Sequence, residues 1–385
     1  MGHNYNSNDH KLPDSKAKRY HIKKDENMEK INSTKLEGFE KEINMGSLKE
    51  FEDFVKWTKQ TDSEKQIFVI KGHGFGIMQP LERILDEKDG PDYANDTLPV
   101  YTIEKVFDKN LEKKLDVLIF DSCAMATIET AYQLRKHAKV MIASEAIMFY
   151  SAVYNSKTEK WEVLTPGIEY EKVLDYLTKN PQADTETIAK AITSSFHEKF
   201  RDDRLLWDNI STVDIVEDQE ATLSATNLEN LETFVDKFEK FSKTLINRLE
   251  DDKTREATVK ALYETMREVQ KYMPPDFDGL FTYVDLFDFL KKLDPKVKDE
   301  ELNNSIKTLK KSDIIIGSVY NNPEFKDSNG LTILFLEDLD QRLEEEKETA
   351  SKIKNYYSKS DFAKKTGWGR VMDLYQGYYP QFYNW

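Results

Sequence analysis

Two short polar motifs carry the side chains that could do covalent chemistry, and each follows an apolar run typical of a buried strand. Residues 67–70 lead to the glycine-flanked His73, and residues 115–120 lead to Asp121-Ser122-Cys123. Cys123 is the only cysteine among the 385 residues. A thiol beside an imidazole can act as a nucleophile, because the imidazole accepts the thiol proton. The two motifs therefore predict a cysteine–histidine pair suited to peptide hydrolysis.

The order of elements around the motifs predicts that the two side chains meet. A helical pattern follows Cys123, and a third buried-type run follows at residues 140–143. Strand–helix–strand order indicates parallel strands joined by crossover helices, and so an α/β sandwich. Reactive groups in such sheets lie just outside the carboxyl ends of the strands. We therefore expect His73 and Cys123 at one edge of a mostly parallel sheet.

Glycine and backbone amides could complete the chemistry at this edge. The glycines around His73 permit a sharp turn, and the amide of Gly74 could join that of Cys123 in binding an oxyanion. A helix expected from Thr127 onward would favour the thiolate and lower the pKa of the thiol. The structural alternative is a buried, unreactive cysteine.

Three further polar residues are candidates for substrate binding. Asp121 lies two residues before Cys123 and therefore points to the same side of the strand. It could orient the imidazole, line a pocket for an Arg or Lys side chain, or be a buried structural acid. Ser144 and Glu145 close the third strand at the same edge. Ser144 and Glu145 could nearly as well be ordinary polar residues at the protein surface with no role in binding.

Composition narrows the function classes. The net charge of −15 argues against sequence-independent nucleic-acid binding and would suit a basic substrate. No run approaches the roughly 20 apolar residues of a membrane span. The N-terminus lacks a hydrophobic secretory core, so we expect a chain that stays inside the cell or one whose leader has been removed.

The pattern of the chain predicts three parts. We expect a disordered polar tail over residues 1–18, an α/β catalytic core over 19–170, and a mainly helical region over 171–385 whose additional strands pack on the core. The helices expected in the last part cover 170–179, 185–200, 228–248, 254–272 and 337–356, and the strands cover 312–319 and 331–335.

The motifs resemble those of the clostripain family of cysteine peptidases, which shares a clan with caspases, legumains and gingipains. Asp121-Ser122-Cys123-Ala124-Met125 resembles the nucleophile motif of the family, and residues 362–368 resemble its C-terminal signature. The segments 42–46, 143–145, 166–170, 222–225, 283–289 and 330–333 recur in the order of the family. The resemblance covers residues 19–380 or so.

This resemblance implies a fold and a reaction. The fold would be a caspase-like three-layer α/β/α sandwich with a mostly parallel sheet, followed by a mainly helical C-terminal part. His73 would be the base and Cys123 the nucleophile. Asp121 would line a pocket for Arg or Lys, so the partners would be protein or peptide substrates with a basic residue before the scissile bond.

The resemblance also implies modes of activation. Many family members cut themselves before the nucleophile strand, and the corresponding stretch here is residues 85–114. Lys88, Lys105 and Lys109 are the candidate cut sites. Calcium dependence occurs in the family, so the resemblance makes calcium a candidate cofactor, although no compact carboxylate loop of EF-hand type is present.

Two other functions compete with an endopeptidase that works through a thioester. One is a non-catalytic interaction protein built on a decayed peptidase fold. Residues 146–151 favour it, because they are apolar where family members carry a Gly/Asp-rich loop with a second pocket acid. The other is a transpeptidase, in which an amine instead of water resolves the acyl-enzyme.

Overall fold

The structure is a computed structural model of the chain. It describes residues 17–22, 33–41, 46–59, 63–78, 98–148, 151–155, 160–164, 168–207, 221–272, 281–320, 323–336 and 344–383. Most of the expected polar tail, residues 1–16, lies outside these ranges. Residues 17 and 18 belong to the first strand, so the expected boundary at residue 18 falls within an element.

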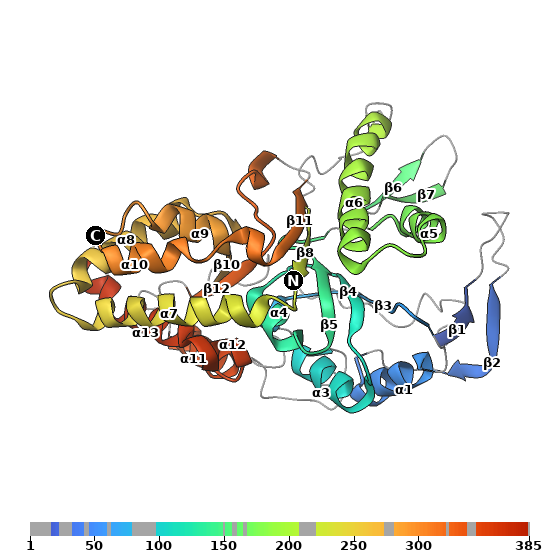
Figure 1. Cartoon of the computed structure of the whole chain (residues 1–385), viewed down its shortest axis with the longest axis horizontal. Coiled ribbons are helices and arrows are strands. Elements are labelled where there is room, and N and C mark those ends of the chain that lie inside the picture. The colour runs from blue at the N-terminus through green and yellow to red at the C-terminus, as the bar shows by residue number, and fades with distance from the viewer. Residues whose placement is uncertain are drawn as a thin grey trace.

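A five-stranded mixed sheet forms the centre of the molecule, in the order β11-β8-β5-β4-β3 (Figure 1). Strands β3 (Ile67–Lys71), β4 (Leu115–Asp121) and β5 (Ala138–Ala143) pair in parallel. Strand β8 (Thr222–Asn227) is antiparallel to β5, and β11 (Ile315–Tyr320) is antiparallel to β8. Four strands therefore run in one direction and β8 in the other, which confirms a mostly parallel sheet.

Helices cover both faces of this sheet. One layer contains α1 (Leu48–Thr58), α3 (Val100–Asn110) and α4 (Ile128–Leu134), and the other contains α5 (Tyr170–Lys179) and α6 (Thr185–Trp207). Successive side chains of a strand point to opposite faces. Leu118 and Phe120 accordingly pack with the first layer, whereas Val117 and Ile119 pack with the second. Burial on both faces explains why the strand reads as one continuous apolar run.

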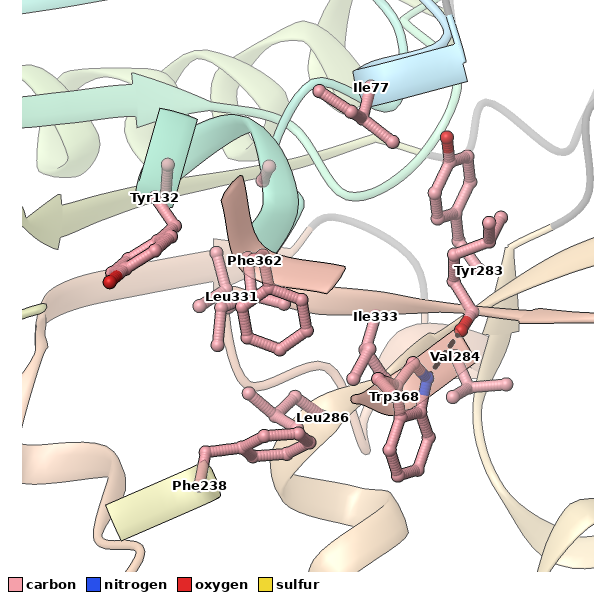
Figure 2. Packing of buried hydrophobic residues seen from close by; sticks show 14 of the residues in the cluster. Ile77, Tyr132, Phe238, Tyr283, Val284, Leu286, Leu331, Ile333, Phe362 and Trp368 are labelled. Carbon is pink, nitrogen blue, oxygen red and sulfur yellow. Dashed lines mark hydrogen bonds between the residues drawn. The ribbon is translucent and has the colours of Figure 1, made fainter. Parts of the chain in front are cut away.

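A second, smaller sheet lies among the C-terminal helices. It is antiparallel, in the order β12-β10-β9. Its strands are β9 (Lys271–Tyr272), β10 (Phe281–Asp285) and β12 (Thr332–Leu336). The helices around it are α7 (Leu231–Glu250), α8 (Arg255–Glu268), α9 (Leu286–Leu293), α10 (Glu300–Lys307), α11 (Glu344–Tyr357), α12 (Asp361–Thr366) and α13 (Trp368–Tyr383). The indole of Trp368 is buried at their centre and donates a hydrogen bond of 2.9 Å to the carbonyl of Leu334 (Figure 2).

Short elements complete the described chain. Two antiparallel hairpins lie outside the main sheets, β1 (Ala17–His21) with β2 (Thr34–Lys41) and β6 (Ser151–Asn155) with β7 (Lys160–Leu164). Single 3₁₀ turns occur at Gly76–Met78, Lys311–Asp313 and Pro323–Phe325. Over the described ranges, none of the helices has the length and apolar character needed to cross a bilayer.

The small sheet is attached directly behind the nucleophile motif. The amide of Thr332 in β12 donates to the carbonyl of Ala126 at 2.9 Å. The buried carboxyl of Glu129 on α4 accepts hydrogen bonds from the amide of Leu334 and the hydroxyl of Tyr357. Strands β8 and β11 of the central sheet also come from beyond residue 170. The C-terminal region therefore supports the catalytic edge, and the central sheet crosses the boundary expected at that residue.

Candidate active site

The structure brings the two predicted motifs to one edge of the sheet. Strands β3 and β4 pair in parallel as far as Lys71 and Asp121. The amide of Gly72 continues the pairing by donating to the carbonyl of Asp121 at 3.3 Å. His73 lies two residues beyond Lys71, and Cys123 lies two residues beyond Asp121, so the parallel pairing brings both to the same end of the sheet. His73 is exposed, whereas Cys123 is half-buried.

Gly74 brings the two loops into direct contact. A Cβ atom at this position would lie 2.4 Å from the carbonyl oxygen of Cys123 and 2.8 Å from Cγ of Met125. Real side chains do not approach so closely, so only glycine lets the backbone after His73 lie against the nucleophile loop. The contact places the backbone of Gly74 beside that of Cys123, and the role of their amides as oxyanion donors stays a prediction.

A second glycine and a buried tyrosine hold the next turn. Gly76 has a φ of +58°, and a Cβ there would lie 2.7 Å from Cγ2 of Thr127. The hydroxyl of Tyr283 donates a hydrogen bond of 2.7 Å to the carbonyl of Phe75. Tyr283 reaches up from β10 toward the turn that carries Ile77 (Figure 2). Sequence reasoning gave no role to Tyr283, because nothing local indicates a partner 208 positions away.

The predicted nucleophile, Cys123, lies in a sharp turn that backbone hydrogen bonds hold in place. Ala124 has a φ of 50°, a left-handed conformation that costs a non-glycine residue on the order of 1 kcal/mol. Its amide donates to the carbonyl of Ala146 at 3.0 Å, and the amide of Ala126 donates to that of Ser144 at 2.9 Å. The segment that follows β5 therefore holds Cys123 in place from behind.

The thiol of Cys123 is covered in this conformation. The amide of Met148 donates to Sγ at 3.2 Å, and Sγ contacts the carbonyl of Met148 at 3.5 Å. Burial raises the pKa of the Cys123 thiol, and the Met148 amide only partly opposes this. Helix α4 begins at Ile128 with Thr127 as its N-cap, which agrees with the helix expected from Thr127 onward, but burial of the thiol determines the direction of the pKa shift. The prediction that a helix N-terminus lowers the thiol pKa is therefore wrong for this conformation.

Asp121 is a fully buried carboxylate with two polar neighbours. The hydroxyl of Tyr170 donates to its Oδ2 atom at 3.1 Å, and Nζ of Lys71 lies 3.2 Å from the same atom. Asp121 alternates with Val117 and Ile119 along β4, so it lies on the side of the sheet covered by α5 and α6. Its role in binding a basic side chain stays a prediction.

Ser144 and Glu145 lie at the predicted edge, and both side chains are buried. The hydroxyl of Ser144 donates to the carbonyl of Ala146 at 3.0 Å. Oε2 of Glu145 accepts a hydrogen bond of 2.9 Å from the amide of Gly330. These contacts hold the scaffold behind the nucleophile loop. A direct role of the two residues in substrate binding stays a prediction.

Glu145 also forms a carboxyl pair with Asp285, the residue that caps α9. Burial, together with the negative charge of Asp285, raises the pKa of Glu145 well above its usual range. Burial raises the pKa of Asp285 to about 6. Oε1 of Glu145 meets no donor among the described residues, so we expect the pair to share a proton.

Among the described residues, no group of acidic side chains matches the calcium site that the resemblance suggests. Within these ranges, one group of three histidine or carboxylate side chains lies close enough to share an ion, and it consists of Glu104, Asp108 and His137. Calcium prefers oxygen ligands alone, so a site with an imidazole does not fit it. Calcium dependence stays a prediction.

Solved structures share this fold. A structure of an inactive zymogen C11 protease from Parabacteroides distasonis matches with a TM-score of 0.57 and 15% identity, over 92% of this chain and 84% of that one. A secreted C11 cysteine protease from Bacteroides thetaiotaomicron, in complex with an irreversible peptide inhibitor, matches with a TM-score of 0.59 and 14% identity, over 92% and 86%. The fold is thus the caspase-like α/β/α sandwich of the C11 cysteine proteases.

Sequence comparison identifies the family. The model of the clostripain family matches residues 12–375. Clostripain from Hathewaya histolytica is 26% identical over 145 residues, which cover 35% of this chain and 25% of the relative. The chain thus aligns with only a quarter of that curated relative. Because the family model spans nearly the whole chain, the chain belongs to the clostripain family of cysteine peptidases.

Proposed function

We propose that the chain is an endopeptidase that hydrolyses peptide bonds through a thioester on Cys123. The observation that carries the proposal is the contact of Gly74 with the carbonyl of Cys123, because it brings the loop of His73 against the nucleophile loop. A protein that only bound partners would not need a lone thiol, an imidazole and a glycine at the same sheet edge. Membership of the clostripain family supports the same reaction.

The proposed chemistry follows from these groups. His73 accepts the proton of the thiol, and the thiolate attacks the carbonyl carbon of the scissile bond. The amides of Gly74 and Cys123 donate to the oxyanion that forms. The imidazolium then protonates the leaving amine, the C–N bond breaks, and a thioester remains. Water, deprotonated by His73, attacks the thioester and releases the acid product and the thiol.

We assign the selection of a basic residue before the scissile bond to Asp121. A buried carboxylate two residues before the nucleophile is well placed to receive an ammonium or guanidinium group. Lys71 already neutralises this charge in the described conformation. A basic substrate would therefore have to displace Lys71 or share the carboxylate with it. The ammonium group of Lys71 can leave, because its side chain is 54% exposed.

The conformation described here fits a resting enzyme. The backbone of Met148 occupies the immediate surroundings of the thiol, and burial keeps the thiol protonated. We propose that the segment from Ala146 to Met148 shifts when a substrate binds, because the substrate carbonyl must reach Sγ. A covered thiol is also compatible with a decayed, non-catalytic protein. Measurable hydrolysis of peptides would distinguish a resting enzyme from such a protein.

We further propose that self-cleavage, where it occurs, uses Lys88. Lys105 and Lys109 both lie inside α3, and Lys109 forms an ion pair with Glu52 at 2.8 Å. A peptidase binds its substrate in an extended form, so a helical segment must unwind before it is cut. Lys88 lies outside the described residues. Mass analysis of the purified chain after incubation would test this site, and Lys88→Gln should stay uncut.

A peptide-library cleavage profile with product masses tests the proposed function. The expected products are two shorter peptides that differ in total mass from the substrate by one water. His73→Ala should lose most of the rate with the same cleavage pattern. Products joined to an added amine would favour the transpeptidase, and an inert chain would favour the interaction protein.

A further inference from the structure

Three metal-ligating side chains converge at the edge of the sheet opposite the thiol. Glu104 and Asp108 lie one turn apart on α3, and His137 lies in the turn between α4 and β5. One ligand atom from each falls within 4.8 Å of the other two. Oδ1 of Asp108 and Nε2 of His137 are 3.4 Å apart. Neighbouring ligands of a tetrahedral zinc ion, with bonds of about 2.0–2.1 Å, are separated by roughly that distance.

The imidazole of His137 faces this cluster through its Nε2 atom. The residue is only 5% exposed, and its Nε2 atom is buried and accepts or donates no hydrogen bond among the described residues. A buried polar nitrogen without a hydrogen bond is unfavourable, so Nε2 of His137 is available to bind a metal ion at this position.

The ligands are held in position by their surroundings. The amide of His137 donates to the carbonyl of Leu134 at 2.9 Å, and its carbonyl accepts from the amide of Leu115 at 2.8 Å. Nε2 of Gln133 donates to Oε2 of Glu104 at 2.6 Å. The bond from Gln133 is of the kind that orients a metal-bound carboxylate, and the two backbone bonds fix the position of His137 in its turn.

We propose that Glu104, Asp108 and His137 bind a divalent transition metal of the zinc type. One imidazole and two carboxylates form a ligand set that zinc accepts, with water as a fourth ligand, whereas calcium would not use the imidazole. Asp108 is exposed, so solvent can deliver the ion.

The site would act on stability and not on the chemistry. His137 directly precedes β5, and its carbonyl accepts from the amide of Leu115 at the start of β4, while Cys123 follows the other end of β4, roughly 20 Å away along seven residues of strand. An ion there would tie α3 to the start of β5. Since α3 leads directly into β4, the ion would fix the approach to the nucleophile strand.

Metal titration of the full chain tests the proposal. A Cys123→Ala background removes the thiol as a competing ligand, and chelator-treated protein would be titrated with Zn²⁺ and with Co²⁺. We expect binding at one ion per chain, a rise in melting temperature, and visible Co²⁺ absorption typical of a four-coordinate site. Ca²⁺ should produce none of these effects.

Variants separate this site from adventitious binding. Asp108→Asn changes an exposed ligand and should leave the fold intact, yet weaken Zn²⁺ binding at least about tenfold, since even the hydrogen-bond partners of ligands contribute that much. Glu112→Gln, at an acid 87% exposed in the connection between α3 and β4, is the matched control and should bind as the parent does. Equal binding by Asp108→Asn and its parent, or no binding by the parent, would overturn the proposal.

Discussion

The ammonium group of Lys71 lies 3.2 Å from the carboxylate of Asp121, the residue expected to receive a basic substrate side chain. The two residues face each other across β3 and β4, so their contact follows from the register of the sheet. Asp121 is fully buried and Lys71 is about half exposed. The enzyme therefore carries a basic group of its own next to its proposed specificity residue, and this group competes with substrate.

Replacing Lys71 by Met should strengthen cleavage after Arg and Lys. The variant keeps an aliphatic stem but removes the competing charge, and Tyr170 still donates to the carboxylate. A partly exposed ion pair contributes up to about 1 kcal/mol, so kcat/KM for basic reporters should rise by up to about fivefold. Lys190→Met, at an exposed lysine of α6, is the control and should have no effect. Unchanged or weaker cleavage after basic residues would show that Lys71 does not compete.

A methyl group at position 74 should disrupt the site. In Gly74→Ala the new Cβ would meet the carbonyl of Cys123 at 2.4 Å, so the two loops must separate. Because displacements of about 1 Å can cost a hundredfold in rate, kcat/KM should fall by about that factor or more. Gly377→Ala, where a Cβ meets nothing within 4 Å, should retain full activity. Circular dichroism would confirm that both variants are folded; near-normal activity of Gly74→Ala would contradict the packing argument.

The reactivity of the thiol should depend on pH in the resting enzyme. Because burial raises the pKa of Cys123, alkylation by iodoacetamide should increase with pH and reach half its maximum above about 8.5, the value of a free thiol. Met148→Gly removes a buried apolar side chain from the cluster against which Cys123 packs and keeps the amide that donates to Sγ, so it should shift this midpoint downward. A midpoint near 6 in the unmodified enzyme would mean that the thiol is not covered in solution. A raised pKa is thus compatible with a resting peptidase as well as with a decayed one.

The buried pair of Glu145 and Asp285 should make stability depend on pH. Both folded pKa values lie above those of exposed carboxyls, so the folded chain holds protons that the unfolded chain releases. The stability from this pair is fully present below about pH 4 and is lost as pH rises from there through the folded pKa values, of which that of Asp285 is about 6.

Glu145→Gln should remove this dependence. Its amide can donate to Asp285 without titrating, so the variant should gain stability relative to the parent between pH 5 and pH 8. Urea unfolding at both pH values measures the difference, with the exposed Glu186→Gln as control. Parallel pH profiles would rule out a shared proton. A selective rise in KM for basic substrates would instead support the predicted role of Glu145 in substrate binding.

The local pattern of the sequence was sufficient to predict the strands that carry the candidate active site. Apolar runs located β3, β4 and β5, and the rule for parallel sheets placed His73 and Cys123 at one edge. The helix expected over residues 254–272 ends earlier, at Glu268, because Lys271 and Tyr272 pair with β10. That pairing depends on residues of β10, and the helical spacing of apolar residues in the sequence gives no information about such a partner.

Contacts between distant residues account for what sequence reasoning missed. The burial of Glu145 depends on Gly330, which is 185 positions away, and on Asp285. Burial raises the pKa of the Cys123 thiol, and the contact of the Met148 backbone with Sγ also joins residues 25 positions apart, where the sequence showed only an apolar segment. Local pattern therefore predicted which residues reach the edge, whereas the fold determines which of them are covered.

Hydrolysis of Arg- and Lys-reporter peptides by Cys123→Ala tests the central claim most directly. The variant removes a single atom from a half-buried side chain, so it should remain folded with an unchanged melting temperature. We expect the parent to hydrolyse the reporters and the variant to show no activity above background, because no other thiol exists in the chain. Hydrolysis by Cys123→Ala at the rate of the parent would contradict a thioester mechanism at this site.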